Sequence, residues 1–216
     1  MNAYIKKRNQ KLGEKTVSAL KKRHFDAYFV ETKKEALEKA IHLIPQSDVI
    51  SWGGSVSVVE TGLIDYLLKN NYNVINRDKA KNKEERTMFL KKALLCDTYL
   101  MGTNAISEDG ELVNIDCVGN RTAALMFGPK SVIIIVSVSK IMPNLDEAIK
   151  RARHFSAPIN IQRVAGNGQR QTPCFTTGCC SDCISKDSIC SHIVTTRLCN
   201  PEKRIKVIIV GEDLGF

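Results

Sequence analysis

The sequence predicts a three-layer α/β fold in which a mostly parallel, open β-sheet lies between two layers of helices. Short apolar runs alternate with amphipathic helical segments along most of the 216 residues. The run SVIIIVSV at residues 131–138 is almost continuously apolar and β-branched, which is typical of a central strand in a parallel sheet. A similar run, RIKVIIV at residues 204–210, predicts a second buried strand.

Before residue 104 the predicted strands and helices alternate. Two capping boxes, Thr32 with Glu35 and Ser57 with Glu60, predict the starts of two helices. Apolar positions at helical spacing predict further helices at about residues 3–24 and 83–95. The strands predicted in this part cover residues 26–30, 48–52, 74–76 and 97–101. Right-handed crossovers would place these strands parallel in one sheet.

After residue 104 the pattern changes. Residues 105–107 and 111–115 predict two short strands around an Asp-Gly turn, which would interrupt the parallel order with an antiparallel pair. An alanine-rich segment at 121–127 predicts a helix, and Asn144 predicts the cap of another that ends at about Phe155.

Residues 157–204 are predicted to be rich in loops and contain most of the cysteines. The strand at 204–210 needs sheet neighbours that such loops cannot supply. We therefore predict a single domain, residues 1–216, with a cysteine-rich insertion at about 166–203.

Composition and charge narrow the classes of function. The sequence has no run of eighteen apolar residues, and its first residues lack the apolar stretch of a signal peptide, so we expect a cytoplasmic protein without a membrane span. The net charge is +9, and residues 1–40 hold eleven basic and five acidic side chains, 11 − 5 = +6. This pattern predicts a solvated helical face rather than nucleic-acid binding. A second basic stretch, residues 150–170, could lie beside an anionic ligand or form plain surface.

Clustered cysteines are the sharpest local feature. In a reducing compartment, clustered thiols are more typical of metal ligands than of disulfides. The spacing C-x5-C-x2-C-x6-C suits four thiolates on zinc or on an iron–sulfur cluster. It does not favour one of these metals over the other. The predicted metal ligands are Cys174, Cys180, Cys183 and Cys190, whereas Cys179 and Cys199 stay spare or substitute ligands.

Two segments predict a binding site for a small anionic metabolite. A loop with adjacent glycines follows a predicted strand and precedes a helix, where backbone N–H groups can approach an anion. The second segment, Asn104 to Arg121, is dense in carboxylates and amides. The predicted ligand-binding residues are Gly53, Gly54, Ser55, Asn104, Asn120 and Arg121. The candidates for acid–base chemistry are Glu108, Asp109 and Asp116.

Four blocks carry a resemblance to a known family. They are SWGGSVSVVETGL, GTNAISEDGELVNIDCVGNRTAALMFGPKSVIIIV, LDEAIKRARHFSAPIN and VIIVGEDLGF. In this order they resemble the LUD, or lactate-utilisation, domain family, in a stand-alone branch with a C-terminal cysteine cluster. The resemblance implies a fold of the NagB/RpiA/CoA-transferase-like type and a part in oxidising L-lactate to pyruvate, usually beside separate iron–sulfur proteins.

These observations lead to a functional expectation with one alternative. We expect a component of a system that oxidises lactate or a related 2-hydroxy acid, with a 4Fe–4S cluster as the first choice of cofactor and zinc as the second. A redox partner protein is expected, and homo-oligomerisation is left open. The alternative is a non-catalytic, metabolite-binding or regulatory protein with a structural zinc.

Overall fold

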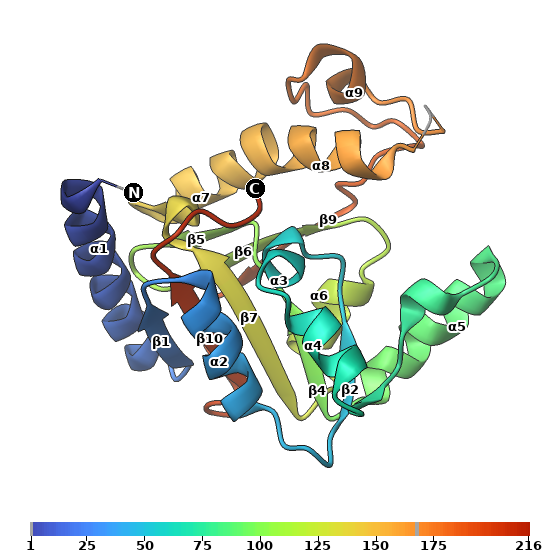
Figure 1. Ribbon diagram of the computed structural model, residues 1–216. Helices are drawn as coiled ribbons and strands as arrows, with labels where there is room; N and C mark the ends of the chain where they lie inside the picture. Colours follow the sequence, from blue (N-terminus) through green and yellow to red (C-terminus); the bar gives the residue numbers. More distant parts are fainter. Residues whose placement is uncertain (1, 167–168) are drawn as a thin grey trace.

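The computed structural model describes residues 2–166 and 169–216 and confirms the predicted α/β class (Figure 1). Its centre is a six-stranded sheet in the order β1-β10-β7-β4-β2-β3, and every pairing in it is parallel. The strands are β1 (Asp26–Val30), β2 (Val49–Trp52), β3 (Asn73–Val74), β4 (Thr98–Met101), β7 (Ser131–Ser137) and β10 (Ile205–Val210). The two runs singled out in the sequence, β7 and β10, are neighbours in the interior of this sheet.

Alternate residues of the central strands enter two separate cores. Ile133 and Ile208 pack with Trp52 on one face of the sheet, beneath α2 (Lys33–Leu43), α3 (Val56–Glu60) and α4 (Leu63–Lys69). Because side chains alternate along a strand, their neighbours Ile134 and Ile209 enter the core on the other face. A buried strand with apolar residues on both faces therefore reads as a continuous apolar run.

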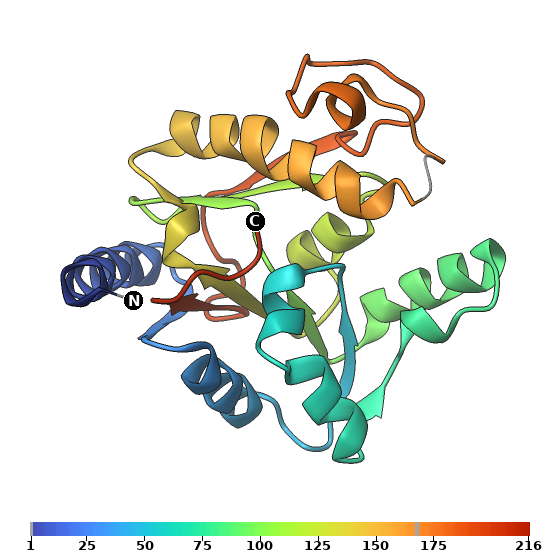
Figure 2. The same cartoon turned by 45° about the horizontal axis from the view of Figure 1, so that its top comes forward.

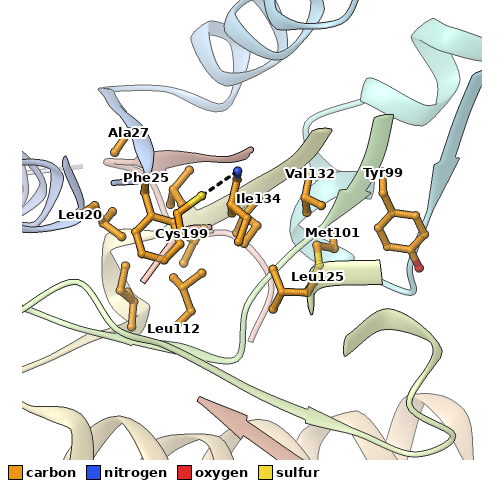
Figure 3. Close-up of a cluster of buried hydrophobic side chains, with 14 of the residues drawn as sticks. Leu20, Phe25, Ala27, Tyr99, Met101, Leu112, Leu125, Val132, Ile134 and Cys199 are labelled. Atoms are coloured by element: carbon orange, nitrogen blue, oxygen red, sulfur yellow. Dashed lines mark hydrogen bonds between the residues drawn. The ribbon is translucent and has the colours of Figure 1, made fainter. Parts of the chain in front are cut away.

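The second core lies between the sheet, α1 (Ala3–Lys22) and α6 (Asn120–Met126) (Figure 3). Leu20 of α1 and Leu125 of α6 are fully buried in it. Cys199 also belongs to this core, and its Sγ accepts a hydrogen bond from the backbone N–H of Ile205 at 3.2 Å. This cysteine therefore packs as a small apolar residue at the start of β10.

A second, four-stranded sheet covers part of the same face, in the order β8-β5-β6-β9 (Figure 2). Its strands are β5 (Ala105–Ser107), β6 (Leu112–Asp116), β8 (Ile141–Met142) and β9 (His192–Thr196). The predicted antiparallel pair β5–β6 is present. The prediction that residues 157–204 are mainly loops is wrong for β9, which pairs antiparallel with β6. Its exposed, weakly alternating residues give no clear strand pattern in the sequence.

The helix predicted to end near Phe155 is longer. It continues from α7 (Leu145–Arg151) through a π-helical stretch, η4 (Ala152–Ser156), into α8 (Ala157–Val164), and forms one rod over the second sheet (Figure 1). Pro158 lies in the first turn of α8, directly after the π-helical stretch. Beyond α8 lies the cysteine segment, defined as residues 169–191, which contains α9 (Pro173–Thr177).

The predicted cap at Ser57 is also wrong. Ser55 caps α3, since its Oγ accepts from the N–H of Val58, and Gly62, with φ of 77°, separates α3 from α4. A left-handed glycine here divides what the sequence suggests is one helix. The remaining helical segments are η1 (Arg77–Lys79), α5 (Lys83–Lys92), η2 (Ala93–Leu95) and η3 (Val138–Lys140). Among the described residues, no helix combines the length and apolar character needed to cross a membrane.

Candidate functional site

A cavity of about 780 Å³ lies at the carboxyl ends of the central strands. Three of its walls are the segments that directly follow β2, β4 and β7, represented by Gly54, Gly102 and Lys140. Parallel α/β sheets bind ligands at this edge, because loops from several strands meet there. The volume is in the range typical of sites for small organic molecules.

The two adjacent glycines are needed because a side chain at either position would crowd a neighbouring arginine, and not because the backbone has unusual angles. Neither Gly53 nor Gly54 has a positive φ. A Cβ on Gly53 would lie 2.9 Å from Cδ of Arg121, closer than two carbon atoms can approach. A Cβ on Gly54 would lie 3.1 Å from Nη2 of Arg77 and 3.6 Å from Nη2 of Arg163. The loop thus lets two guanidinium groups approach its backbone from the cavity side.

Arg121 organises the wall that adjoins this loop. It donates hydrogen bonds to the Gly102 carbonyl at 3.1 Å, Asn114 Oδ1 at 2.8 Å, Asn104 Oδ1 at 3.2 Å and the Ile115 carbonyl at 2.6 Å. Burial lowers the pKa of Arg121, while the nearby Asp116 carboxylate opposes that shift. Both predicted residues Asn104 and Arg121 line the cavity, but much of their hydrogen-bonding capacity holds the wall together.

Asp116 lines the cavity and also caps α6. Its carboxylate accepts backbone N–H bonds from Cys117 at 2.9 Å, Arg121 at 3.0 Å and Thr122 at 2.9 Å. Three such bonds fix the carboxylate at a helix start, where negative charge is favourable. The geometry therefore gives Asp116 a positioning role, and the Thr122 hydroxyl donates a further hydrogen bond to it at 3.3 Å.

Glu108 and Asp109 lie at the opposite end of the β5–β6 hairpin, against α1. Glu108 forms an ion pair with Lys15, and the backbone carbonyl of Asp109 accepts a hydrogen bond from Nε of Arg23 at 2.6 Å. Neither residue belongs to the cavity lining. Sequence proximity suggested one site, but an extended hairpin carries its turn away from its open end, so these two carboxylates do not join Asp116.

Cationic side chains dominate the rest of the cavity. Six of them come from four segments of the chain: Arg77, Lys83, Arg86, Lys91, Arg163 and Arg170. The basic stretch noted at residues 150–170 supplies the last two. No sequence pattern indicated Arg77 of η1 or the three residues of α5, since basic residues in charged segments are usually solvated. Burial lowers the pKa of Arg77 and of Arg163, and the charges of Arg77 and Arg121 lower that of Arg163 further.

Lys140 is the cavity residue that sequence reasoning missed most completely. It is 3% exposed, and its Nζ donates a hydrogen bond to Oγ of Ser57 at 3.1 Å. Burial lowers the pKa of Lys140 to about 7, with smaller contributions from the charges of Arg151 and Arg121. It stands in an apolar stretch at the end of β7, where a lone lysine gives no pattern to detect.

The four cysteines predicted as metal ligands lie in one neighbourhood. Burial raises the pKa of the Cys190 thiol to about 11, and the thiols of Cys174, Cys180 and Cys183 add to this shift in that order. Cys179 is exposed on the surface. In the part of the chain that the structure describes, no three His, Cys, Asp or Glu side chains are gathered closely enough to hold a metal ion.

The cysteine segment is continuous with the cavity. Cys117, Cys174 and Cys190 pack against one buried cluster that contains Ile189, and Ile189 and Cys117 also line the cavity. Nη1 of Arg170 lies 3.5 Å from Sγ of Cys117. The thiol neighbourhood and the cationic cavity therefore share a wall.

The fold and the site can now be compared with known proteins. The sequence model of the LUD domain matches residues 13–210. The chain belongs to the LUD domain family. The resemblance noted in the sequence is thereby confirmed, together with the association of the LUD domain with lactate utilisation. No curated protein matches this LUD-domain chain.

One solved structure shows the same fold, and two others align over about half of the chain. A DUF162 family protein from Deinococcus radiodurans aligns with a TM-score of 0.53 at 13% identity, covering 94% of this LUD-domain chain and 98% of that protein. Ribose 5-phosphate isomerase A from Neisseria gonorrhoeae aligns with a TM-score of 0.35 at 19% identity, over 52% and 54% of the two chains. The delta subunit of eIF2B from Chaetomium thermophilum gives 0.37 at 15% identity, over 56% and 54%.

Proposed function

We propose that this LUD-domain protein binds a small 2-hydroxy or 2-oxo carboxylic acid in the cationic cavity and takes part in the oxidation of a lactate-type acid. The carrying observation is the gathering of six cationic side chains from four segments around one cavity, two of them half-buried (Arg77 and Arg170) and four exposed (Lys83, Arg86, Lys91 and Arg163). The nearby carboxylates are fewer: Asp116 already caps a helix, and Asp78 lies beside Arg77 and Arg86. Like charges gathered in one cavity repel one another, and a bound anion offsets that repulsion.

Arg77 and Arg163 are the side chains best placed to bind the carboxylate. Their Nη2 atoms flank Gly54 at the entrance to the cavity. The Nε atom of Arg77 is buried without a hydrogen-bond partner in the described part of the chain, and the Asp78 carboxylate lies 3.6 Å away from it. An arginine can present paired N–H groups to a carboxylate, which makes the contact specific as well as strong. Asn120 and Ser55 are proposed as additional polar contacts on the same walls.

The donor set of the cysteine segment fits a thiolate-bound metal centre. Four half-buried cysteines lie in one segment among Ser, Thr, Gly and Asp residues, and the thiols of three of them are near enough to Cys190 to raise its pKa. We propose Cys174, Cys180, Cys183 and Cys190 as ligands of a 4Fe–4S cluster, with zinc as the alternative metal. A cluster would supply one-electron transfer, and a redox partner protein would then accept or return the electron.

Metal analysis tests the cysteine proposal. Protein purified without oxygen should be brown, with broad absorption near ~400 nm and iron and sulfide in equal amounts. Cys183→Ser should lose the metal, whereas Cys179→Ser, the exposed neighbour, should retain it and serves as the matched control. Colourless wild type with one zinc per chain supports the structural-zinc alternative, and metal-free wild type contradicts both assignments.

Ligand binding tests the cavity proposal independently of the metal. L-lactate and pyruvate should raise the Tm of the wild-type protein, since a ligand at about 100 times its Kd adds about 2.7 kcal/mol. Gly54→Val should remove this shift, because its side chain would contact the guanidinium groups of Arg77 and Arg163. Val59→Ala, an exposed substitution in the same region, is the control. Equal stabilisation of wild type and Gly54→Val by the acid would place the binding site elsewhere.

A further inference from the structure

Lys140 has an unusual combination of position and contacts. It ends η3, the short helix that follows β7 at the carboxyl edge of the sheet. It lines the cavity, although only 3% of the residue is exposed. In the described part of the chain its Nζ makes a hydrogen bond to Oγ of Ser57 and no ion pair. A neutral amine has two N–H bonds and one lone pair. One N–H bond is used by Ser57, so one N–H bond and the lone pair remain for a ligand.

The groups packed around Lys140 come from several elements. Arg151 of α7 and Arg121 of α6 place positive charge near it, and Glu60 of α3 is the acidic group that opposes them. The Glu60 carboxylate accepts a hydrogen bond from the backbone N–H of Gly215 at 2.8 Å. Lys140 is therefore a buried amine in positive surroundings, without a carboxylate in direct contact.

We propose that Lys140 is a carbonyl-reactive amine whose Nζ forms an imine with the carbonyl carbon of an anionic 2-oxo acid or aldehyde held in the cavity. The proposal rests on the proposed function, since the cationic side chains of the same cavity would bring the anion to the amine. It adds a covalent role that carboxylate binding alone does not require.

The step balances as follows. The lone pair of the neutral Nζ attacks the carbonyl carbon and forms an N–C bond, and the carbonyl oxygen takes up a proton to give a carbinolamine. The C–O bond then breaks, and the oxygen leaves as water with the two protons that Nζ carried. The Ser57 hydroxyl, 3.1 Å from Nζ, can relay a proton between nitrogen and oxygen. Water reverses the step and releases the carbonyl compound.

The ionisation of Lys140 supports this reactivity. Its lowered pKa, about 7, leaves a large share of the amine neutral at neutral pH, whereas exposed lysines are almost fully protonated. Lys15 and Lys130 provide the contrast, because hydrogen bonds to Glu108 and Asp97 raise their pKa values. Both are exposed, so they serve as internal references for unselective labelling.

The experiment traps the imine by reduction. Wild-type protein is incubated with pyruvate and cyanoborohydride at pH 7, and modified lysines are located and timed by peptide mass spectrometry. Lys140 should be modified at least about tenfold faster than Lys15 or Lys130, because its neutral fraction is larger by more than that factor. L-lactate has no ketone or aldehyde group to form an imine, so it should compete with pyruvate and slow modification of Lys140. Lys140→Arg should carry no adduct at this position or at a new one.

Two outcomes overturn the proposal and can be told apart. If pyruvate raises the Tm of the wild type but modification is spread evenly over exposed lysines, Lys140 is not the reactive amine, and anion binding in the cavity still stands. If pyruvate and L-lactate neither raise the Tm nor change labelling, the proposed function fails together with the inference. The comparison within the wild-type protein holds even if Lys140→Arg does not fold.

Discussion

The protein has two basic regions, helix α1 and the cavity, and their basic side chains have different surroundings. Helix α1 carries lysines in water, and the ion pairs of Lys6 with Glu31 and of Lys15 with Glu108 raise the pKa values of both lysines. In the cavity, burial lowers the pKa values of Arg121 and Lys140. The sign of the pKa shift separates the two regions: the α1 lysines are exposed and paired with carboxylates, whereas Arg121 and Lys140 are shifted mainly by burial.

The composition of the sequence does not reveal which of the two basic regions contains buried basic side chains. Residues 1–40 concentrate basic side chains in the sequence, while the cavity collects single cations from segments far apart in the chain. The region with the higher density of charge in the sequence is therefore the weaker candidate for a specific site. Four predictions test the contrast, from the largest expected effect to the smallest.

Arg121→Met should destabilise the protein by about 3–5 kcal/mol, because it removes a buried charge that satisfies four oxygen acceptors. Urea unfolding followed by circular dichroism measures the change. Lys11→Met on α1 is the matched control and should leave the urea midpoint unchanged, since Lys11 is exposed. Similar losses for both variants would contradict the distinction between the regions.

Lys140→Met should change the pH dependence of stability. The lysine binds a proton in the unfolded chain below about pH 10.5, but in the folded protein only below about pH 7. Between these values the unfolded state binds more protons, so the stability of the wild type rises with pH by up to about 1.4 kcal/mol per unit. Lys140→Met should lack this rise. The difference between its free energy of unfolding and that of the wild type should therefore shrink from pH 7 towards pH 10. Parallel curves of the two proteins would show that Lys140 is not desolvated.

Arg163→Ala should weaken binding of L-lactate or pyruvate by about 10- to 100-fold, the range expected for a lost hydrogen bond to a charged group. The fold should survive, because Arg163 is exposed as a residue and its hydrogen bonds are to Asn160 of its own helix. Isothermal titration calorimetry gives both Kd values. Arg153→Ala, which removes an ion pair with Asp182 outside the cavity lining, is the control, and an equal loss there would argue against a local contact.

Binding of a polyanion such as heparin to α1 should be weak, non-specific and lost between roughly 50 and 200 mM salt. The double substitution Lys7→Ala and Lys11→Ala should reduce it further without a measurable change in Tm, since both side chains are exposed. Fluorescence titration at several salt concentrations follows the effect. Salt-resistant binding to one nucleic-acid sequence would reverse the ranking of the two basic regions.

The regular parts of the fold were predictable because their signals are local. The runs that become β7 and β10 and the cap at Thr32 need no distant partner to be recognised. The helix boundary at Gly62 and strand β9 were missed, because a left-handed residue and a pairing with β6 depend on the rest of the structure.

The site was predictable in part. The glycine loop and the segment from Asn104 to Arg121 do meet at one cavity, as expected for loops at the carboxyl edge of a sheet. Sequence reasoning could not find Lys140 or Arg77, whose significance lies in their burial and not in their neighbours along the chain. It also grouped Glu108 and Asp109 with Asp116, although the length of the hairpin separates them.

The place of β10 in the sheet has a consequence for biosynthesis. This strand joins β1 to β7, yet it follows every other strand in the chain. During translation, β1 and β7 therefore leave the ribosome before the strand that connects them, and the pairs that close the sheet are among the most distant in sequence. The thiols of the cysteine segment also leave the ribosome before β10, while the nascent sheet is still open.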